Sequence, residues 1–449
     1  MKPGLFYTSL ILSLILLTQL ACATPSIGQT MTLEDCLKAG INNNPSLKAS
    51  RFGVSSAGHD IKAARADFLP SVSSSYSVNS LASHSSKGPT ESDYLDQDTR
   101  AFNIKLTQIL YAGSRIVNTY EKARIMEQAV KAEMDLEKLE LIFNIETTFY
   151  KLMKAREDVI TATESVNRLA ESVKAARAFF QKELVPYVDV LQARVDLADA
   201  KDQLGLAKNN VNRERVALFS LMNLSLNPGI QFSGGLYQTL EEKPSFESSL
   251  KYALEKRPDI KSLMHQLEIT VKEAEIAMGK YLPTINFVIG YYDQNTDYEA
   301  LGSSLTGDYD RDQRNRYWST GIYATWNIFD GGRSWYEKEK YNTEAEKIKA
   351  LIKEARNMIS TGIYRALYSM SEAHQRMASS ADALIAAKEY YEMEEKRLMA
   401  GISTIPSLLD AQERLIRSQG NKTRAMLDYQ LAAAELKFMK GTPAASGTD

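Results

Sequence analysis

Cysteine is nearly absent from the 449 residues of the chain, which contain only Cys22 and Cys36. If the amino-terminal segment is removed after Ala23, Cys36 is left alone and no disulfide can form within the chain. Removal before Cys22 would instead make that residue a candidate for a lipid anchor, although it lacks the leucine usually found three positions earlier. Lipidation of Cys22 and its loss with the leader both stay open.

An excess of one charge is also missing, because 54 Lys and Arg residues face 56 Asp and Glu residues. This balance argues against a nucleic-acid partner, which usually requires a basic surface. The four histidines lie far apart without metal-ligand spacing, and no glycine-rich loop carries the lysine of a nucleotide site. We therefore expect no enzyme activity, no catalytic residues, no metal and no cofactor.

Only one long apolar run is present, at residues 5–20. It follows a basic start at Met1-Lys2 and precedes small residues at 21–23, which is the pattern of a secretory signal peptide over residues 1–23. A retained anchor is the alternative, although the run is marginal for a membrane span of about 20 residues. Since no second such run follows, we expect any later membrane crossing to use strands of a closed barrel.

The chain carries an internal duplication. Pro45 and Pro70 are 25 residues apart, and so are Pro258 and Pro283. Two more matched landmarks follow in the same order, 111–115 with 329–333 and 191–194 with 409–412. We therefore predict two structural repeats, with a linker and a flexible tail. The repeats are residues 31–225 and 244–440, the linker or equatorial segment is residues 226–243, and the tail is residues 441–449.

Glycine and proline are both missing from residues 114–185, a run of 72 residues. A continuous helix of that length would reach roughly 110 Å. Apolar residues step by three and four along it, which is typical of a coiled coil or a helical tube. Each repeat is predicted to open with a helix and to end with a long helix and a return helix. The predicted helices are 33–67, 114–182, 188–222, 246–280, 333–400 and 408–440.

Strands are predicted between the opening and long helices of each repeat, where apolar and polar residues alternate. Their approximate bounds are 71–83, 99–112, 284–293 and 317–330. Such alternation over about 10 residues is typical of an outer-membrane barrel, and a half-buried strand of a soluble sheet is the alternative. The tryptophans Trp318, Trp326 and Trp335 lie in or beside the last strand, which favours an aromatic girdle at a membrane interface.

The number of strands predicts an oligomer. Four strands per chain cannot close a barrel, because the smallest known barrels have about eight. Three copies would supply twelve strands, so we predict a homotrimer.

The duplicated order resembles the TolC-like outer-membrane factors, the outer membrane efflux protein family. The segments that carry the resemblance are TLEDCLKAGINNNPSLK, FLP, YLP, NIFDGGR, VDVLQAR and AGISTIPSLLDAQERL. The resemblance implies a mixed α and β fold in which the tandem units form a trimeric 12-strand outer-membrane β-barrel and a long α-helical periplasmic barrel. It also implies an exit duct of a tripartite efflux pump or a type I secretion system, with cargo and transporter class left open. The implied partners are outer-membrane lipid, a periplasmic adaptor (membrane fusion protein) and an inner-membrane transporter.

The resemblance also implies functional residues at the two helix tips. Counted from Gly401, the two pore-constricting aspartates of the family fall on Ser407 and Asp410, so only one acid is kept. Asp189 is the equivalent of Ser407 in the first repeat. Glu183 stands where the tip would have a glycine, so we expect that loop to turn by another route, using Pro186. The implied adaptor-facing residues are Leu184, Val185, Gly401, Ile402 and Ser403.

Each of these assignments has an alternative. Asp410 is either a pore residue or an acid on a solvated helix face, and the tip residues are either a docking surface or simple turns. A periplasmic coiled-coil adaptor or scaffold would explain the long helices but not the alternating strands. A secreted enzyme would need a convergent polar site that the sequence does not show.

Overall fold

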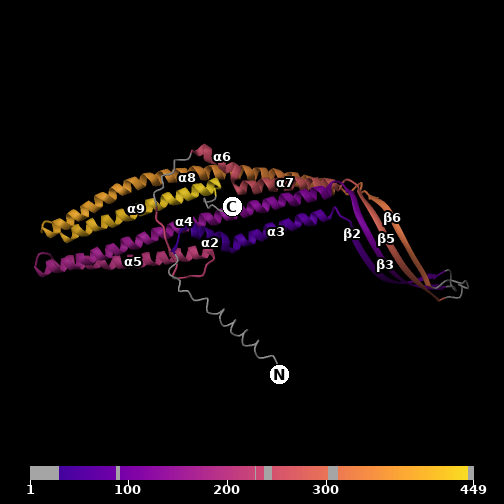
Figure 1. Cartoon of the computed structure of the whole chain (residues 1–449), viewed down its shortest axis with the longest axis horizontal. Helices are drawn as coiled ribbons and strands as arrows, with labels where there is room; N and C mark the ends of the chain where they lie inside the picture. Colours follow the sequence, from indigo (N-terminus) through magenta and orange to yellow (C-terminus); the bar gives the residue numbers. More distant parts are fainter. Residues whose placement is uncertain (1–29, 87–91, 228, 237–244, 302–311, 443–449) are drawn as a thin grey trace, which may run out of the picture. The chain divides into compact units, whose positions relative to one another are not determined.

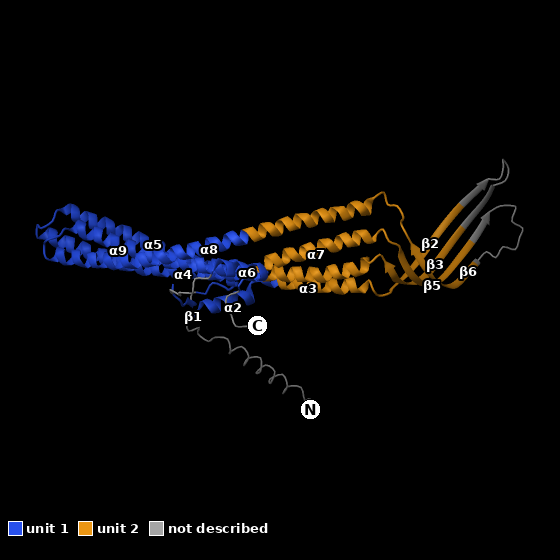
Figure 2. Ribbon diagram, turned by 90° about the horizontal axis from the view of Figure 1, so that it is seen from above, with its two compact units in different colours: residues 1–48, 137–256, 358–449 blue, residues 49–136, 257–357 orange. Residues whose placement is uncertain are grey.

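The computed structural model describes residues 30–86, 92–227, 229–236, 245–301 and 312–442. The predicted signal peptide, Cys22 and most of the predicted tail lie outside these residues. The chain forms two compact units, one of residues 1–48, 137–256 and 358–449 and another of residues 49–136 and 257–357 (Figure 2). Within the described ranges, no helix is long and apolar enough to cross a membrane.

Two series of elements follow each other along the chain (Figure 1). The first comprises α2 (Leu33–Asn43), α3 (Pro45–Ala66), β2 (Ser71–Ser86), β3 (Ser92–Ala112), α4 (Arg115–Gln181) and α5 (Tyr187–Met222). The second comprises α6 (Phe246–Lys256), α7 (Pro258–Gly279), β5 (Thr284–Leu301), β6 (Asp312–Thr325), α8 (Arg333–Met399) and α9 (Ile405–Lys440). Matched helices have equal lengths, since α4 and α8 each have 67 residues and α5 and α9 each have 36. A short parallel pair, β1 (Thr30–Met31) with β4 (Gln231–Phe232), lies outside this pattern.

The prediction of one continuous opening helix in each repeat is wrong. Each is broken into two helices, at Asn44 and at Arg257, whose ψ angles are 124° and 128°. Both residues precede a proline, whose ring disfavours the helical conformation of its neighbour. The Asn44 Oδ1 atom accepts the backbone N–H of Ser46 at 2.9 Å, so the broken end is capped.

Residue Cys36 lies in α2 and is fully buried. Burial, together with the nearby charge of Asp35, raises the pKa of its thiol to about 12. Because the thiolate is the reactive form, this cysteine is chemically inert at neutral pH.

One four-stranded antiparallel sheet, ordered β2-β3-β5-β6, belongs to the second unit. Ser71 lies opposite Thr107 in the first hairpin, and Thr284 lies opposite Thr325 in the second. The residue numbers of matched positions in the two hairpins therefore differ by 213 in the first strand and by 218 in the second strand. The landmark prolines and glycines differ by the same two offsets, so the repeats share one hairpin register.

The strand bounds differ from the predicted ones. All four strands continue farther toward their connecting loops, because antiparallel pairing satisfies the backbone groups whatever the polarity of the side chains. In contrast, β6 ends at Thr325 and not near 330, so Trp326 lies beyond the strand. Its partner β5 begins only after Pro283, which has no N–H to donate, so no paired strand is available there.

The two faces of the sheet differ in polarity, because successive side chains point to opposite faces. Apolar and aromatic residues share one face. They include Val72, Tyr76, Phe102, Ile104, Leu106, Ile285, Phe287, Ile289, Tyr291, Trp318 and Ile322. The other face carries serines, Asn103, Lys105 and the stacked rings of Tyr292 and Tyr317, whose centroids are 5.0 Å apart.

Candidate functional site at the helix tips

Both hairpin tips, at the turns α4–α5 and α8–α9, belong to the first unit. The N–H of Leu184 donates to the Phe179 carbonyl at 3.0 Å, and the N–H of Ile402 donates to the Arg397 carbonyl at 3.0 Å. The preceding residues, Glu183 and Gly401, have φ angles of 58° and 73°. The expectation that Glu183 forces another route is therefore wrong: it adopts the left-handed turn itself. An L-residue in that region costs about 1–2 kcal/mol relative to glycine.

The return helices begin differently at the two tips. Pro186 is the residue before α5 and makes no side-chain cap. Thr404 caps α9, because its Oγ1 atom accepts the N–H of Ser407 at 3.3 Å. The Ser407 hydroxyl lies 2.9 Å from the same atom, so this residue belongs to the helix cap.

An apolar cluster joins the two hairpins next to the tips. Its buried members are Leu169, Val173, Ala176, Val190, Ala193, Ala200, Leu398, Ile405, Leu408 and Leu409. Val185 packs against this cluster, and the Ser403 hydroxyl donates to the buried Glu394 carboxylate. Leu184 and Ile402, by contrast, are 65% and 67% exposed, and Gly401 is exposed as well. The predicted adaptor-facing set thus splits into three exposed residues and two that turn inward.

A groove of about 1030 Å³ lies along α4, α5 and α9 close to the tips. Asp189 and Asp410 both line this groove, whereas Ser407 does not. Six acidic and three basic side chains line the groove. They are Asp158, Asp189, Asp196, Asp199, Asp410 and Glu413, with Lys154, Arg417 and Arg424. Within the described ranges, no group of three or more His, Cys, Asp or Glu side chains is placed to hold a metal ion.

The acidic side chains of the groove differ in their surroundings. Asp410 pairs with Arg414 at 2.9 Å, and the two side chains are 49% and 64% exposed. Burial raises the pKa of Asp196, and the charges of Asp199 and Glu413 raise it further. The sequence interpretation missed Asp196, Asp199 and Glu413. The steps of three and four from Asp189 through 192, 196 and 199 indicate that Asp196 and Asp199 share a face of α5 with Asp189, and Glu413 follows Asp410 by three residues on α9.

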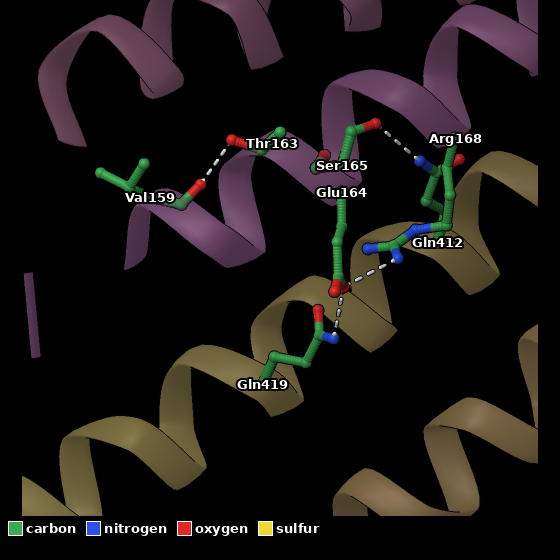
Figure 3. A network of polar contacts seen from close by, with 7 residues as sticks. All are labelled: Val159, Thr163, Glu164, Ser165, Arg168, Gln412 and Gln419. Carbon is green, nitrogen blue, oxygen red and sulfur yellow. Dashed lines mark hydrogen bonds and ion pairs between the residues drawn. The ribbon is translucent and has the colours of Figure 1, made fainter. Parts of the chain in front are cut away.

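Polar contacts also connect α4 with α9 beside the groove (Figure 3). The Glu164 carboxylate accepts from Arg168 at 3.3 Å on the same helix and from Gln419 at 3.4 Å on α9. The Gln412 amide, 1% exposed, donates to the Ser165 carbonyl at 3.4 Å. These bonds fix the two hairpins relative to each other in addition to the apolar cluster.

The three tryptophans of the predicted girdle all belong to the second unit. Trp318 lies within β6 and is 74% exposed. The indole N–H of Trp326, just after β6, donates to the Tyr281 carbonyl at 2.8 Å. Trp335 lies in the first turn of α8, with the Lys338 ammonium 5.7 Å from its ring centroid. Of the three tryptophans, Trp318 therefore lies within β6, and the other two lie beyond it.

Comparison with known proteins gives consistent results. The family model described as outer membrane efflux protein matches residues 37–224 and 250–442. The alkaline protease secretion protein AprF of Pseudomonas aeruginosa is 23% identical over 434 residues, covering 91% of this chain and 84% of AprF. The outer membrane protein TolC of Vibrio cholerae is 20% identical, covering 89% and 88%. The solved outer-membrane channel OprN shares the fold, with a TM-score of 0.77, 16% identity and coverage of 91% and 89%.

Proposed function

The chain belongs to the outer membrane efflux protein family, and from this premise we propose that it is the exit duct of a tripartite efflux pump or a type I secretion system. The family makes it an outer-membrane channel protein with a periplasmic helical extension, and not an enzyme. In the proposed role it passively conducts substrates that an inner-membrane transporter and a periplasmic adaptor deliver. The relatives include both a secretion protein, AprF, and an efflux protein, BepC of Brucella suis.

The observation that carries the proposed homotrimer is the open sheet. In the described strands, the order β2-β3-β5-β6 leaves β2 and β6 each paired along one edge. Unpaired edges cannot face lipid, because their backbone groups would lack hydrogen bonds. Pairing of β6 with β2 of the next copy closes a twelve-strand barrel with three copies.

The duplication predicts the register of that junction. Within one chain, Ile104 of β3 lies opposite Tyr291 of β5. The residue that matches Ile104 in the second repeat is Ile322 of β6, 218 positions later. The residue that matches Tyr291 in the first repeat is Val78 of β2, 213 positions earlier. Ile322 should therefore lie opposite Val78 of the neighbouring copy.

Disulfide trapping tests this junction. In a variant without Cys22 and Cys36, the pair Ile322→Cys and Val78→Cys should give oxidised dimers and trimers on non-reducing gels. The control pair Ile322→Cys and Ser74→Cys is four residues out of register, roughly 13 Å along the strand, which is too far for a disulfide. Equal cross-linking of both pairs, or of neither, would contradict the closed trimer.

We also assign the pore constriction to Asp410 and Asp189, with Ser407 beside them in the α9 cap. Three copies would bring both carboxylates together around the axis, where they hold cations. The double variant Asp189→Ala and Asp410→Ala should change single-channel conductance and relieve block by divalent cations in planar bilayers. Asp202→Ala is the control, since Asp202 is exposed on α5 outside the groove. An unchanged conductance and block in the double variant would refute the assignment and leave the duct intact.

The adaptor contact is proposed for the exposed tip residues Leu184, Gly401 and Ile402. Val185 and Ser403 support the tips from below, through the apolar cluster and Glu394. Replacing Leu184 and Ile402 with Asp should abolish export in cells while the trimer still assembles. Normal export by that variant would contradict the contact.

A further inference from the structure

The apolar face of the β2-β3-β5-β6 sheet ends at a row of charged residues. Ile104, Tyr291 and Trp318 lie side by side on β3, β5 and β6. Two residues farther toward the loops, Phe102 lies beside Asp293, and Asp293 lies beside Arg316. The next step of two on the same face brings Arg100 beside Asn295, and Asn295 beside Arg314. Arg100, Arg314 and Arg316, called the arginine row below, thus border the apolar band.

One carboxylate forms ion pairs with two guanidinium groups of this row. The Asp293 carboxylate accepts from Arg314 at 3.0 and 2.8 Å and pairs with Arg316 at 3.2 Å. The aspartate side chain is 19% exposed, whereas the two arginine side chains are 56% and 52% exposed. Asp293 therefore pairs with both arginines, and Arg100 is a third exposed cation on this face.

Acidic residues lie on the same face, two residues farther toward the loops than Arg100 and Asn295. Asp98 lies opposite Asp297 and accepts from Ser80, and Asp297 accepts from the Asn295 amide at 3.5 Å. From the apolar band toward the loops, the face therefore changes from aromatic to basic to acidic. Steps of two residues place these rows about 7 Å apart.

We propose that the arginine row binds the phosphate groups of membrane lipids whose acyl chains cover the adjacent apolar band. This inference rests on the proposed function, which places the sheet in the membrane. Guanidinium groups bind phosphate oxygens with two parallel hydrogen bonds. A lipid phosphate lies directly outside the acyl chains, at the level where Trp318 and Tyr291 mark an interface. The acidic row lies farther toward the water, outside the phosphate level.

Tryptophan quenching by brominated lipid tests the site, with Trp318 as the reporter. Trp326→Phe and Trp335→Phe leave Trp318 as the single tryptophan, two residues from Arg316 on the same face. This protein is reconstituted in phosphatidylcholine vesicles that contain brominated phosphatidic acid or brominated phosphatidylcholine. Phosphatidic acid should bind at least about fivefold better than phosphatidylcholine, which is the effect of about one basic residue at a membrane surface.

Substitutions then assign the preference. The triple variant Arg100→Gln, Arg314→Gln and Arg316→Gln should bind both lipids equally, and Arg100→Gln alone should lose part of the preference. Lys105→Gln is the control, because it removes a cation from the opposite face of the same strand and should keep the preference. A preference that survives the triple variant, or that Lys105→Gln removes equally, would overturn the proposal.

Two further outcomes separate the possible causes of failure. Equal quenching by both lipids in the unsubstituted site overturns lipid-phosphate binding and leaves the membrane placement standing. Quenching by neither lipid overturns the membrane placement, and the inference with it. Inorganic phosphate should compete no better than chloride at the same ionic strength, and specific competition would show a site for free phosphate instead.

Discussion

We expect substitution of Gly113 by alanine to lower the free energy of unfolding strongly. Its φ angle is 61°, and a Cβ atom there would lie 2.3 Å from the Gly279 carbonyl oxygen and 2.9 Å from the Leu282 Cβ. The duplication supplies a matched position, Gly331, with a φ angle of 71° and nothing within 4 Å of an added Cβ. The two glycines share the backbone strain and differ in the close approach.

The expected costs follow from these two terms. An alanine at either position pays about 1–2 kcal/mol for the left-handed conformation. At Gly113 the opposing atom belongs to the backbone and cannot rotate away, so overpacking adds about 1–3 kcal/mol. We therefore expect Gly113→Ala to lower the free energy of unfolding by about 2–5 kcal/mol and Gly331→Ala by about 1–2 kcal/mol.

Urea unfolding in detergent, followed by tryptophan fluorescence, measures this difference. All three tryptophans belong to the same unit as both glycines. Both variants are compared at the same protein concentration and in the same detergent, so that any contribution of neighbouring copies is the same in both. If Gly113→Ala costs no more than Gly331→Ala, the close approach of the β3–α4 turn to the end of α7 is refuted.

Three other predictions concern the helices. Leu139→Pro, in the buried face of α4, should cost about 3 kcal/mol or more beyond Leu139→Ala, because it also removes a backbone bond; equal effects in thermal unfolding would contradict the continuous helix. Glu183→Gly should stabilise the first tip by up to about 1 kcal/mol, whereas Gly401→Ala should destabilise the second by about 1–2 kcal/mol; a lower denaturant midpoint for Glu183→Gly, or an unchanged or higher midpoint for Gly401→Ala, would refute the left-handed turns. Asp196→Asn should stabilise the protein increasingly as pH rises above 3.8 and through the raised pKa of Asp196. The folded state holds the Asp196 proton above the ordinary pKa of 3.8, so the stability that this proton contributes is lost as pH rises through the raised pKa; a pH-independent difference between the variants would exclude this coupling.

The residues that line the groove could be predicted only in part from the sequence. Asp410 and Asp189 were found through the resemblance to a family, and both line the groove. Asp196 and Glu413 were not found, because they come from different helices and their proximity depends on the packing of α5 beside α9. Ser407 is a position at which the resemblance implies an acid, and its hydroxyl lies 2.9 Å from the capping Thr404 Oγ1 atom of α9.

Local physical chemistry made much of the fold readable in the sequence. The absence of proline and glycine after Ser114 predicts a long helix, since nothing interrupts its hydrogen bonds, and two-residue alternation predicts strands. The breaks at Asn44 and Arg257 also have a local cause, because each residue precedes a proline. Only the tertiary structure decided that β3 pairs with β5, that Glu183 turns left-handed, and that Gly113 meets Gly279. The strand pairing and the glycine contact join residues that are distant in the sequence, so no local pattern contains their energies, whereas the turn at Glu183 is a local conformation that a non-glycine residue rarely adopts.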